Sequence, residues 1–141
     1  MEESFAQSAG RHLTDSCELM KKGRLDNAVY LAGYVVECAF KTLVQIYHDY
    51  NMAKAYGHNL VDLQGQAMER LRVLYPAADL RLPHSRTSGT ILDIDHPVRR
   101  YARTGLWSSD EVRQAVERAH EIYEEIILGL ILDGVIPSKE L

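Results

Sequence analysis

The chain has 141 residues, of which 46% are hydrophobic and 26% are charged, and its net charge is −4 at pH 7. This length and composition predict one soluble globular domain spanning residues 1–141. The acidic balance argues against coating of nucleic acid by the whole surface, although it leaves room for a local basic patch. Cys17 and Cys38 belong to no metal or redox motif, and the N-terminus has no apolar signal-peptide region. A cytoplasmic protein with reduced cysteines is therefore expected.

Apolar residues recur at spacings of three and four along four segments, which predicts helices over residues 3–22, 25–47, 59–75 and 109–133. Gly23, Pro76 and Gly134 stand where three of these helices would end. Ser108 and Glu111 have the spacing of a capping box at the start of the last one. Because no segment alternates with a period of two, we predict an all-α, antiparallel four- to five-helix up-and-down bundle.

The segment 25–47 is apolar on nearly every side, as in a central, buried helix. Its polar residues keep to one stripe, at spacings of three and four: Asn27, Tyr30, Tyr34, Glu37, Lys41 and Gln45. Glu37 and Lys41 form an i, i+4 pair in the favourable order. They are either an ordinary pair on a buried helix or groups that line a groove or hold a neighbouring loop. Two charges in mid-segment argue against a membrane span.

The connection over residues 76–107 is much longer than a usual link between helices. It contains five arginines and three aspartates, so it is locally basic. A long connection of this kind is either functional or disordered, and residues 89–93 could form a short helix. Arg99, Arg100, Tyr101 and Arg103 mix guanidinium and aromatic groups, which suits phosphate contact and base stacking. The alternative is a solvated loop whose arginines pair with acidic helix faces.

Several histidines could have a chemical role. His58 precedes the third helix, where a local capping contact is the more usual role and a ligand or catalytic role the less usual one. Asp93, Asp95 and His96, with His84 nearby, could supply oxygen and nitrogen ligands to a metal. They match no known ligand spacing, however, so we expect no metal and no cofactor.

Arg113 and His120 lie seven residues apart, about two helical turns, and would share a face of the last helix. An imidazole can remove the proton of an RNA 2′-hydroxyl while a guanidinium stabilises the charged phosphorane. The pair could therefore support metal-independent RNA cleavage. A short motif of this kind also arises by chance, in which case the two residues form a surface pair.

Three motifs resemble the HEPN family of small helical bundles. Residues 28–43 (AVYLAGYVVECAFKTL) are similar to its central-helix signature, in which Glu37 is followed four residues later by Lys41. Residues 57–60 (GHNL) resemble the sequence that opens the next helix, and Arg100-Tyr101 resembles a pair before the last long helix. The resemblance implies a bundle that is usually a homodimer. Family members often occur beside a minimal nucleotidyltransferase, in a two-protein system of the toxin–antitoxin type.

Some HEPN proteins bind nucleotides, and others are RNases with an Arg-x4–6-His motif. This chain departs from the RNase pattern, because Gln114 follows Arg113 and His120 lies well inside its helix. Our first hypothesis is a nucleotide- or RNA-binding module with this set of contacts: Glu37, Lys41, Arg99, Arg100, Tyr101 and Arg103. The alternative is a metal-independent endoribonuclease that uses Arg113 and His120. A non-catalytic scaffold or antitoxin is a third possibility.

Overall fold

The computed structural model describes residues 1–94 and 96–138, and within them it contains helices and turns but no strand. The helices are α1 (Phe5–Lys21), α2 (Leu25–Tyr47), α3 (Tyr50–Ala55), α4 (Leu60–Asp62), α5 (Met68–Leu74), α6 (Ser109–Tyr123) and α7 (Gly129–Leu132). The π-helical turn η1 (Leu63–Ala67) joins α4 to α5, and η5 (Glu124–Leu128) joins α6 to α7. The result is four long helical runs and the short α3. The prediction of an all-α helical bundle is confirmed.

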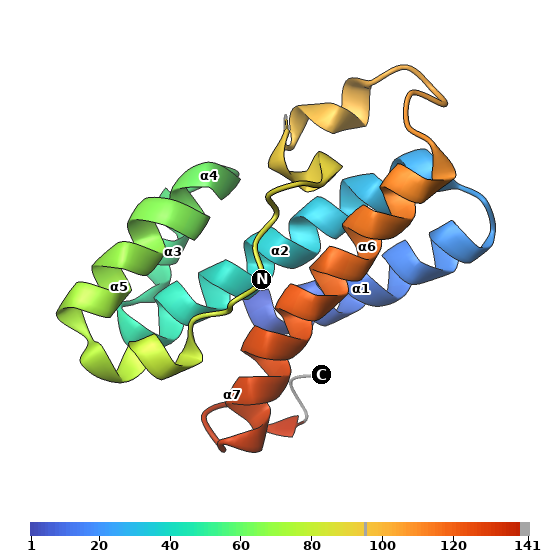
Figure 1. Ribbon diagram of the computed structural model, residues 1–141. Coiled ribbons are helices and arrows are strands. Elements are labelled where there is room, and N and C mark those ends of the chain that lie inside the picture. Colours follow the sequence, from blue (N-terminus) through green and yellow to red (C-terminus); the bar gives the residue numbers. More distant parts are fainter. Residues whose placement is uncertain (95, 139–141) are drawn as a thin grey trace.

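Helix α2 lies at the centre of this bundle. Helix α1 runs antiparallel to it, α6 packs along the same pair, and the α4–α5 run lies beside the C-terminal part of α2 (Figure 1). Val29, Val35, Val36 and Leu43 of α2 are completely buried. By length and composition alone α2 could cross a membrane, but 72% of its most apolar window is buried inside the molecule. That burial is typical of the core helix of a globular protein.

Local sequence explains where the helices begin. The side chains of Ser4, Asp49 and Asn59 each accept a backbone N–H in the first turn of α1, α3 and α4. Ser108 and Glu111 form the predicted capping box at the start of α6, with both reciprocal hydrogen bonds present. Helix α3 was not predicted, because its six residues are too short to show a helical period.

The long connection between α5 and α6 is built from three short 3₁₀ turns: η2 (Pro76–Arg81), η3 (Ile91–Asp93) and η4 (Val98–Tyr101). The short helix that the sequence suggested at residues 89–93 is the turn η3. Between η2 and η3 the chain forms an irregular strap, residues 82–90, that crosses in front of α2 between the α4–α5 run and α6 (Figure 1). The connection then folds back over the N-terminal half of α2, which brings a distant part of the sequence to the polar stripe.

Candidate functional site

The polar stripe of α2 runs from the surface into the interior. Tyr30 and Tyr34 are partly exposed, whereas the side chains of Glu37 and Lys41 are only 4% and 7% exposed. Lys41 Nζ donates to Glu37 Oε2 at 3.1 Å. A charge pair this well buried is retained only when its remaining polar atoms also have partners.

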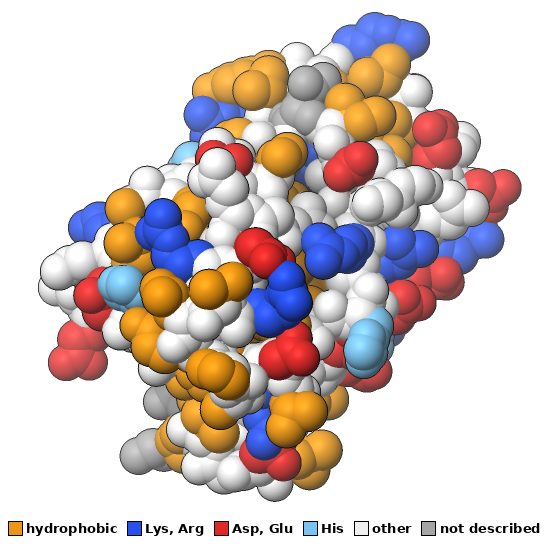
Figure 2. All heavy atoms as spheres, turned by 60° about the vertical axis from the view of Figure 1, so that its left-hand side comes forward, with side chains coloured by type: hydrophobic (Ala, Val, Ile, Leu, Met, Phe, Trp, Pro, Cys, Tyr) orange, Lys and Arg blue, Asp and Glu red, His pale blue; other side chains and the backbone are white. Residues whose placement is uncertain are grey.

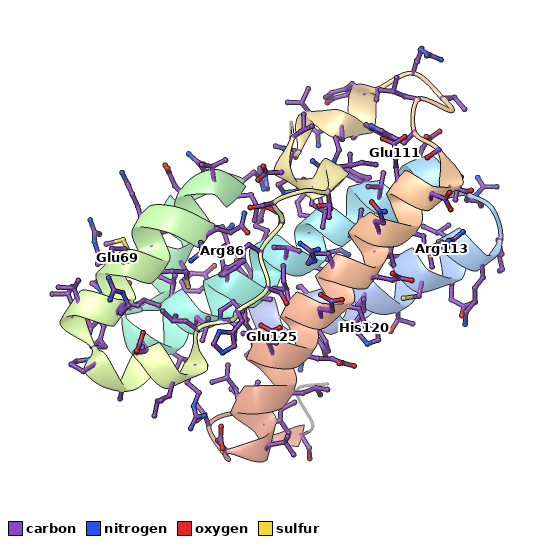
Figure 3. All side chains as sticks on the ribbon, viewed as in Figure 1. Glu69, Arg86, Glu111, Arg113, His120 and Glu125 are labelled. Carbon is purple, nitrogen blue, oxygen red and sulfur yellow. The ribbon has the colours of Figure 1, made fainter. Side chains whose placement is uncertain are left out.

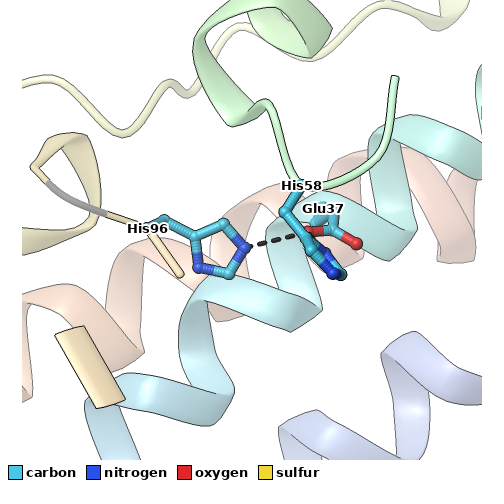
Figure 4. A group of neighbouring side chains, drawn as sticks. All are labelled: Glu37, His58 and His96. Carbon is cyan, nitrogen blue, oxygen red and sulfur yellow. Dashed lines mark hydrogen bonds and ion pairs between the residues drawn. The ribbon is translucent and has the colours of Figure 1, made fainter. Parts of the chain in front are cut away.

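Two histidines from separate segments supply those partners (Figure 4). His58 Nδ1 lies 3.0 Å from Glu37 Oε1, and His96 Nε2 lies 2.9 Å from the same oxygen. Since an ionised carboxylate only accepts hydrogen bonds, both ring nitrogens carry the proton in this arrangement. His58 comes from the turn before α4 and His96 from the long connection. Glu37 therefore fastens two distant segments to the central helix.

The electrostatics of Glu37 follow from this arrangement. Burial alone would raise the pKa of the carboxyl group, because it removes water from the charged form. The hydrogen bond from His96, the charge of Lys41 and the hydrogen bond from His58 outweigh burial, and the net pKa is lowered. Glu37 is accordingly an ionised carboxylate held by three donors.

Gly33, one turn before Glu37, permits the close approach of the long connection. A β-carbon at this position would lie 2.5 Å from both Arg99 Nη2 and His96 Nδ1. Arg99 is only 4% exposed, and its Nη1 donates to the backbone oxygens of Ile91 and Ile94. The structure thus places Arg99 in the interior, holding the turn η3, rather than on the surface with Arg100.

Tyr34 frames the mouth of the site. Its ring makes edge contacts with His58, His96 and Tyr30, at centroid distances of 5.5, 4.8 and 5.2 Å. Burial and a hydrogen bond with Tyr30 raise the pKa of the Tyr34 hydroxyl. Because His58 remains 56% exposed, the cluster is reached from solvent on the side of His58.

Arg100 and Tyr101 lie on the surface beside this mouth. The guanidinium of Arg100 sits 4.7 Å from the centroid of the Tyr101 ring, and a hydrogen bond with Tyr30 raises the pKa of Arg100. Arg103 is also exposed. The structure brings Arg100 and Tyr101 to the polar stripe of α2 through Tyr30. It keeps Glu37, Lys41 and Arg99 below the surface, where Lys41 pairs with Glu37 and Arg99 Nη1 donates to backbone oxygens.

A cavity of about 480 Å³ lies behind Arg99, between the long connection and the start of α6. Trp107, Leu106 and Ile91 give it apolar walls, and Asp93 and Glu111 add two carboxylates. Those carboxylates oppose a phosphate group inside the cavity. The cavity is therefore a poor site for a phosphate group, although Arg99 also lines it.

Arg113 and His120 lie on the exposed side of α6 (Figure 3). Arg113 Nη1 is 3.1 Å from Asp110, and His120 Nε2 is 2.8 Å from Glu124. Each residue thus pairs with an acidic neighbour on its own helix, and among the described contacts none joins the two. Their catalytic role stays a prediction.

The aspartate and histidine set near residue 93 does not gather as a unit in the described part of the chain. Asp93 accepts from Thr87, and the backbone of His84 donates to Glu125. Asp95 lies outside the described residues. His96 instead lies beside Glu37 and His58. One nitrogen of each imidazole and one carboxylate oxygen of Glu37 all lie within 4.8 Å of one another.

Sequence reasoning singled out Glu37 and Lys41 but missed the parts played by Gly33, His58 and His96. The available signal for Gly33 was the glycine itself, in the middle of the polar stripe, because a residue without a side chain permits close approach of another segment. No local signal pairs His58 or His96 with Glu37, because they lie 21 and 59 residues away in the chain.

Comparison of the chain with protein-family models, with curated proteins and with solved structures finds no match. The geometry of the site and the motifs in the sequence therefore carry the functional argument.

Proposed function

We propose that the protein is a HEPN-like module that binds a nucleotide or RNA at the surface formed by Tyr30, Arg100 and Tyr101. The observation that carries the proposal is an exposed guanidinium, that of Arg100, which lies over the Tyr101 ring and makes a hydrogen bond with Tyr30. Such a guanidinium can contact a phosphate while a neighbouring ring stacks on a base. The resemblance of the central helix to the HEPN signature supports the same class of ligand.

The surrounding contacts keep this surface in place. Arg99 holds the backbone of the connection from below, and His96 ties it to Glu37 on α2. A ligand site gains affinity when its groups are held in position before binding, since less freedom is lost on association. In this proposal Glu37, Lys41 and Arg99 position the surface, and Arg100, Tyr101 and Arg103 contact the ligand.

Charge reversal of Arg100 tests the proposal. We expect Arg100→Glu to weaken binding of a fluorescently labelled ATP analogue, or of a short single-stranded RNA, by about tenfold or more, because a hydrogen bond to a charged group contributes about 1.5–3 kcal/mol. Fluorescence anisotropy measures the affinity. Arg70→Glu makes the same charge change on the exposed side of α5, away from this surface, and should bind like wild type. If Arg100→Glu binds both ligands like wild type, the ligand is bound elsewhere or not at all.

The proposal includes a protein context. By resemblance, the module is a homodimer that acts with a minimal nucleotidyltransferase in a system of the toxin–antitoxin type. A neighbouring reading frame that encodes such an enzyme, and copurification of its product with this chain, would support the partnership. Light scattering of the purified chain distinguishes a dimer from a monomer.

A further inference from the structure

The nitrogen atoms of His58 and His96 point at the same oxygen of Glu37, and the three side chains come from three separate parts of the chain (Figure 4). Two imidazoles and one carboxylate are a common ligand set for divalent transition metals. Ligand atoms bound about 2.0–2.2 Å from one ion lie roughly 3 Å apart when they are adjacent in its coordination shell. The two nitrogen–oxygen distances, 3.0 and 2.9 Å, are close to that separation, and all three ligand atoms lie within 4.8 Å of one another.

We propose that Glu37, His58 and His96 bind one divalent transition-metal ion of the zinc class. His58 would bind through Nδ1, His96 through Nε2 and Glu37 through Oε1. Three protein ligands leave a fourth position for water, on the side where His58 is open to solvent. The ion would join α2, the turn before α4 and the long connection at one point.

The neighbours of the cluster can support a bound ion. Lys41 holds the other oxygen of Glu37, which fixes the carboxylate and leaves Oε1 for the metal. His96 Nδ1 lies 3.4 Å from Arg99 Nη2. Metal binding requires the proton of each ring to move to the other nitrogen, Nε2 of His58 and Nδ1 of His96. The end of the flexible Arg99 side chain must then move slightly away from His96 Nδ1.

The surroundings also select the kind of ion. Lys41 and Arg99 are both buried cations near the cluster. They repel a metal cation, so they disfavour one that would be held only by its attraction to the Glu37 carboxylate. Zinc, nickel and copper bind imidazole strongly, whereas magnesium and calcium prefer a shell of oxygen atoms. Zn²⁺ is therefore expected to bind and Mg²⁺ is not.

Calorimetric titration of the EDTA-treated protein with Zn²⁺ tests the site. We expect one ion per chain for wild type and an affinity at least about tenfold lower for His58→Ala. His58 is half exposed, so this variant should keep the fold, which circular dichroism checks. His120→Ala is the matched control, because it removes another exposed histidine that pairs with a carboxylate, and it should bind Zn²⁺ within about twofold of wild type.

Co²⁺ gives a second readout, since its visible absorption changes when imidazole and carboxylate ligands replace water. That change should appear in wild type and in His120→Ala but not in His58→Ala. The assignment is overturned if wild type binds no Zn²⁺, if His58→Ala binds it as tightly as wild type, or if His120→Ala loses as much affinity. Comparable binding of Mg²⁺ at the same place would overturn the assignment of the metal class.

Discussion

At Gly33 the backbone of α2 leaves a space that His96 and Arg99 fill. We expect Gly33→Ala to push both side chains away, because its β-carbon would lie 2.5 Å from each. Forcing an extra methyl group into packed surroundings costs about 1–3 kcal/mol, which should exceed the roughly 1 kcal/mol that alanine gains over glycine within a helix. Urea denaturation measures the net change in the free energy of unfolding.

Gly129 of α7 provides the control for this substitution. Apart from its chain neighbours and the backbone of its own helix, no atom lies within 4 Å of a β-carbon built there. Gly129→Ala should therefore be neutral or stabilising by up to about 1 kcal/mol. Equal effects at the two glycines would show that the close approach at Gly33 has no energetic importance.

Glu37 binds two segments, and its conversion to glutamine separates that role from simple packing. The amide of Glu37→Gln keeps the size of the side chain but turns an NH₂ group toward Lys41 or toward the histidines, which are all donors in this arrangement. We expect amide hydrogen exchange in residues 96–103 to accelerate by more than the loss in global stability explains. Glu18→Gln on the exposed face of α1 should change neither. If exchange and global stability fall together in Glu37→Gln, Glu37 is a plain core residue.

At the scale of elements, hydrogen bonds from polar side chains attach the strap of residues 82–90 to the helices on either side. The side chain of Gln64 accepts the Thr87 N–H at 3.0 Å and donates to the Thr87 hydroxyl at 2.8 Å, and both residues are buried. Arg118 of α6 donates to the backbone oxygens of Arg86 and Ser88. The strap is therefore bonded to the α4–α5 run on one side and to α6 on the other.

Removing the Gln64 side chain should release the strap. In Gln64→Ala the buried N–H of Thr87 loses its partner, which costs about 1–3 kcal/mol. Gln66→Ala, on the exposed side of the same helical run, should be nearly neutral. Chemical denaturation of both variants checks the difference, and a Gln64→Ala protein as stable as wild type would contradict this account of the strap.

Glu125 makes the attachment of the strap depend on pH. It accepts the backbone N–H groups of His84 and Ser85 and the Ser85 hydroxyl, from the π-helical turn after α6 (Figure 3). Partial burial raises the pKa of Glu125, but these hydrogen bonds to its charged form outweigh burial and lower the pKa below the usual 4.5. The stabilisation is therefore complete well above pH 4.5 and is lost as the pH falls through the lowered value. Hydrogen exchange at residues 84 and 85, corrected for its intrinsic pH dependence, should show more opening in acid for wild type and much less pH dependence for Glu125→Gln.

For the whole molecule, the sequence predicted what depends on local periodicity and local capping. The bounds of α2, the capping box at Ser108 and the all-α class follow from spacings of three and four residues. The route of residues 76–107 did not follow, because it is fixed by contacts such as Gln64 with Thr87 and Glu37 with His96. Partners this far apart in the chain leave no periodic signal, so the sequence could name Glu37 and Lys41 but not the histidines that complete their cluster.

The surface of the whole molecule sets the salt dependence of binding to RNA. Acidic and basic side chains are interspersed over the face in Figure 2, and the net charge is −4. Binding should therefore depend on Arg100 and Arg103, two exposed arginines of the long connection, rather than on a broad basic surface. Each phosphate neutralised on a single strand contributes a slope of about −0.7 to a plot of log affinity against log salt. Two contacts predict a slope of about −1.4, measured by anisotropy with labelled single-stranded RNA over a range of salt concentrations, and Arg100→Glu should make it shallower. A slope several times steeper would indicate a wider electrostatic footprint, and a slope of zero would mean that phosphates are not what this surface binds.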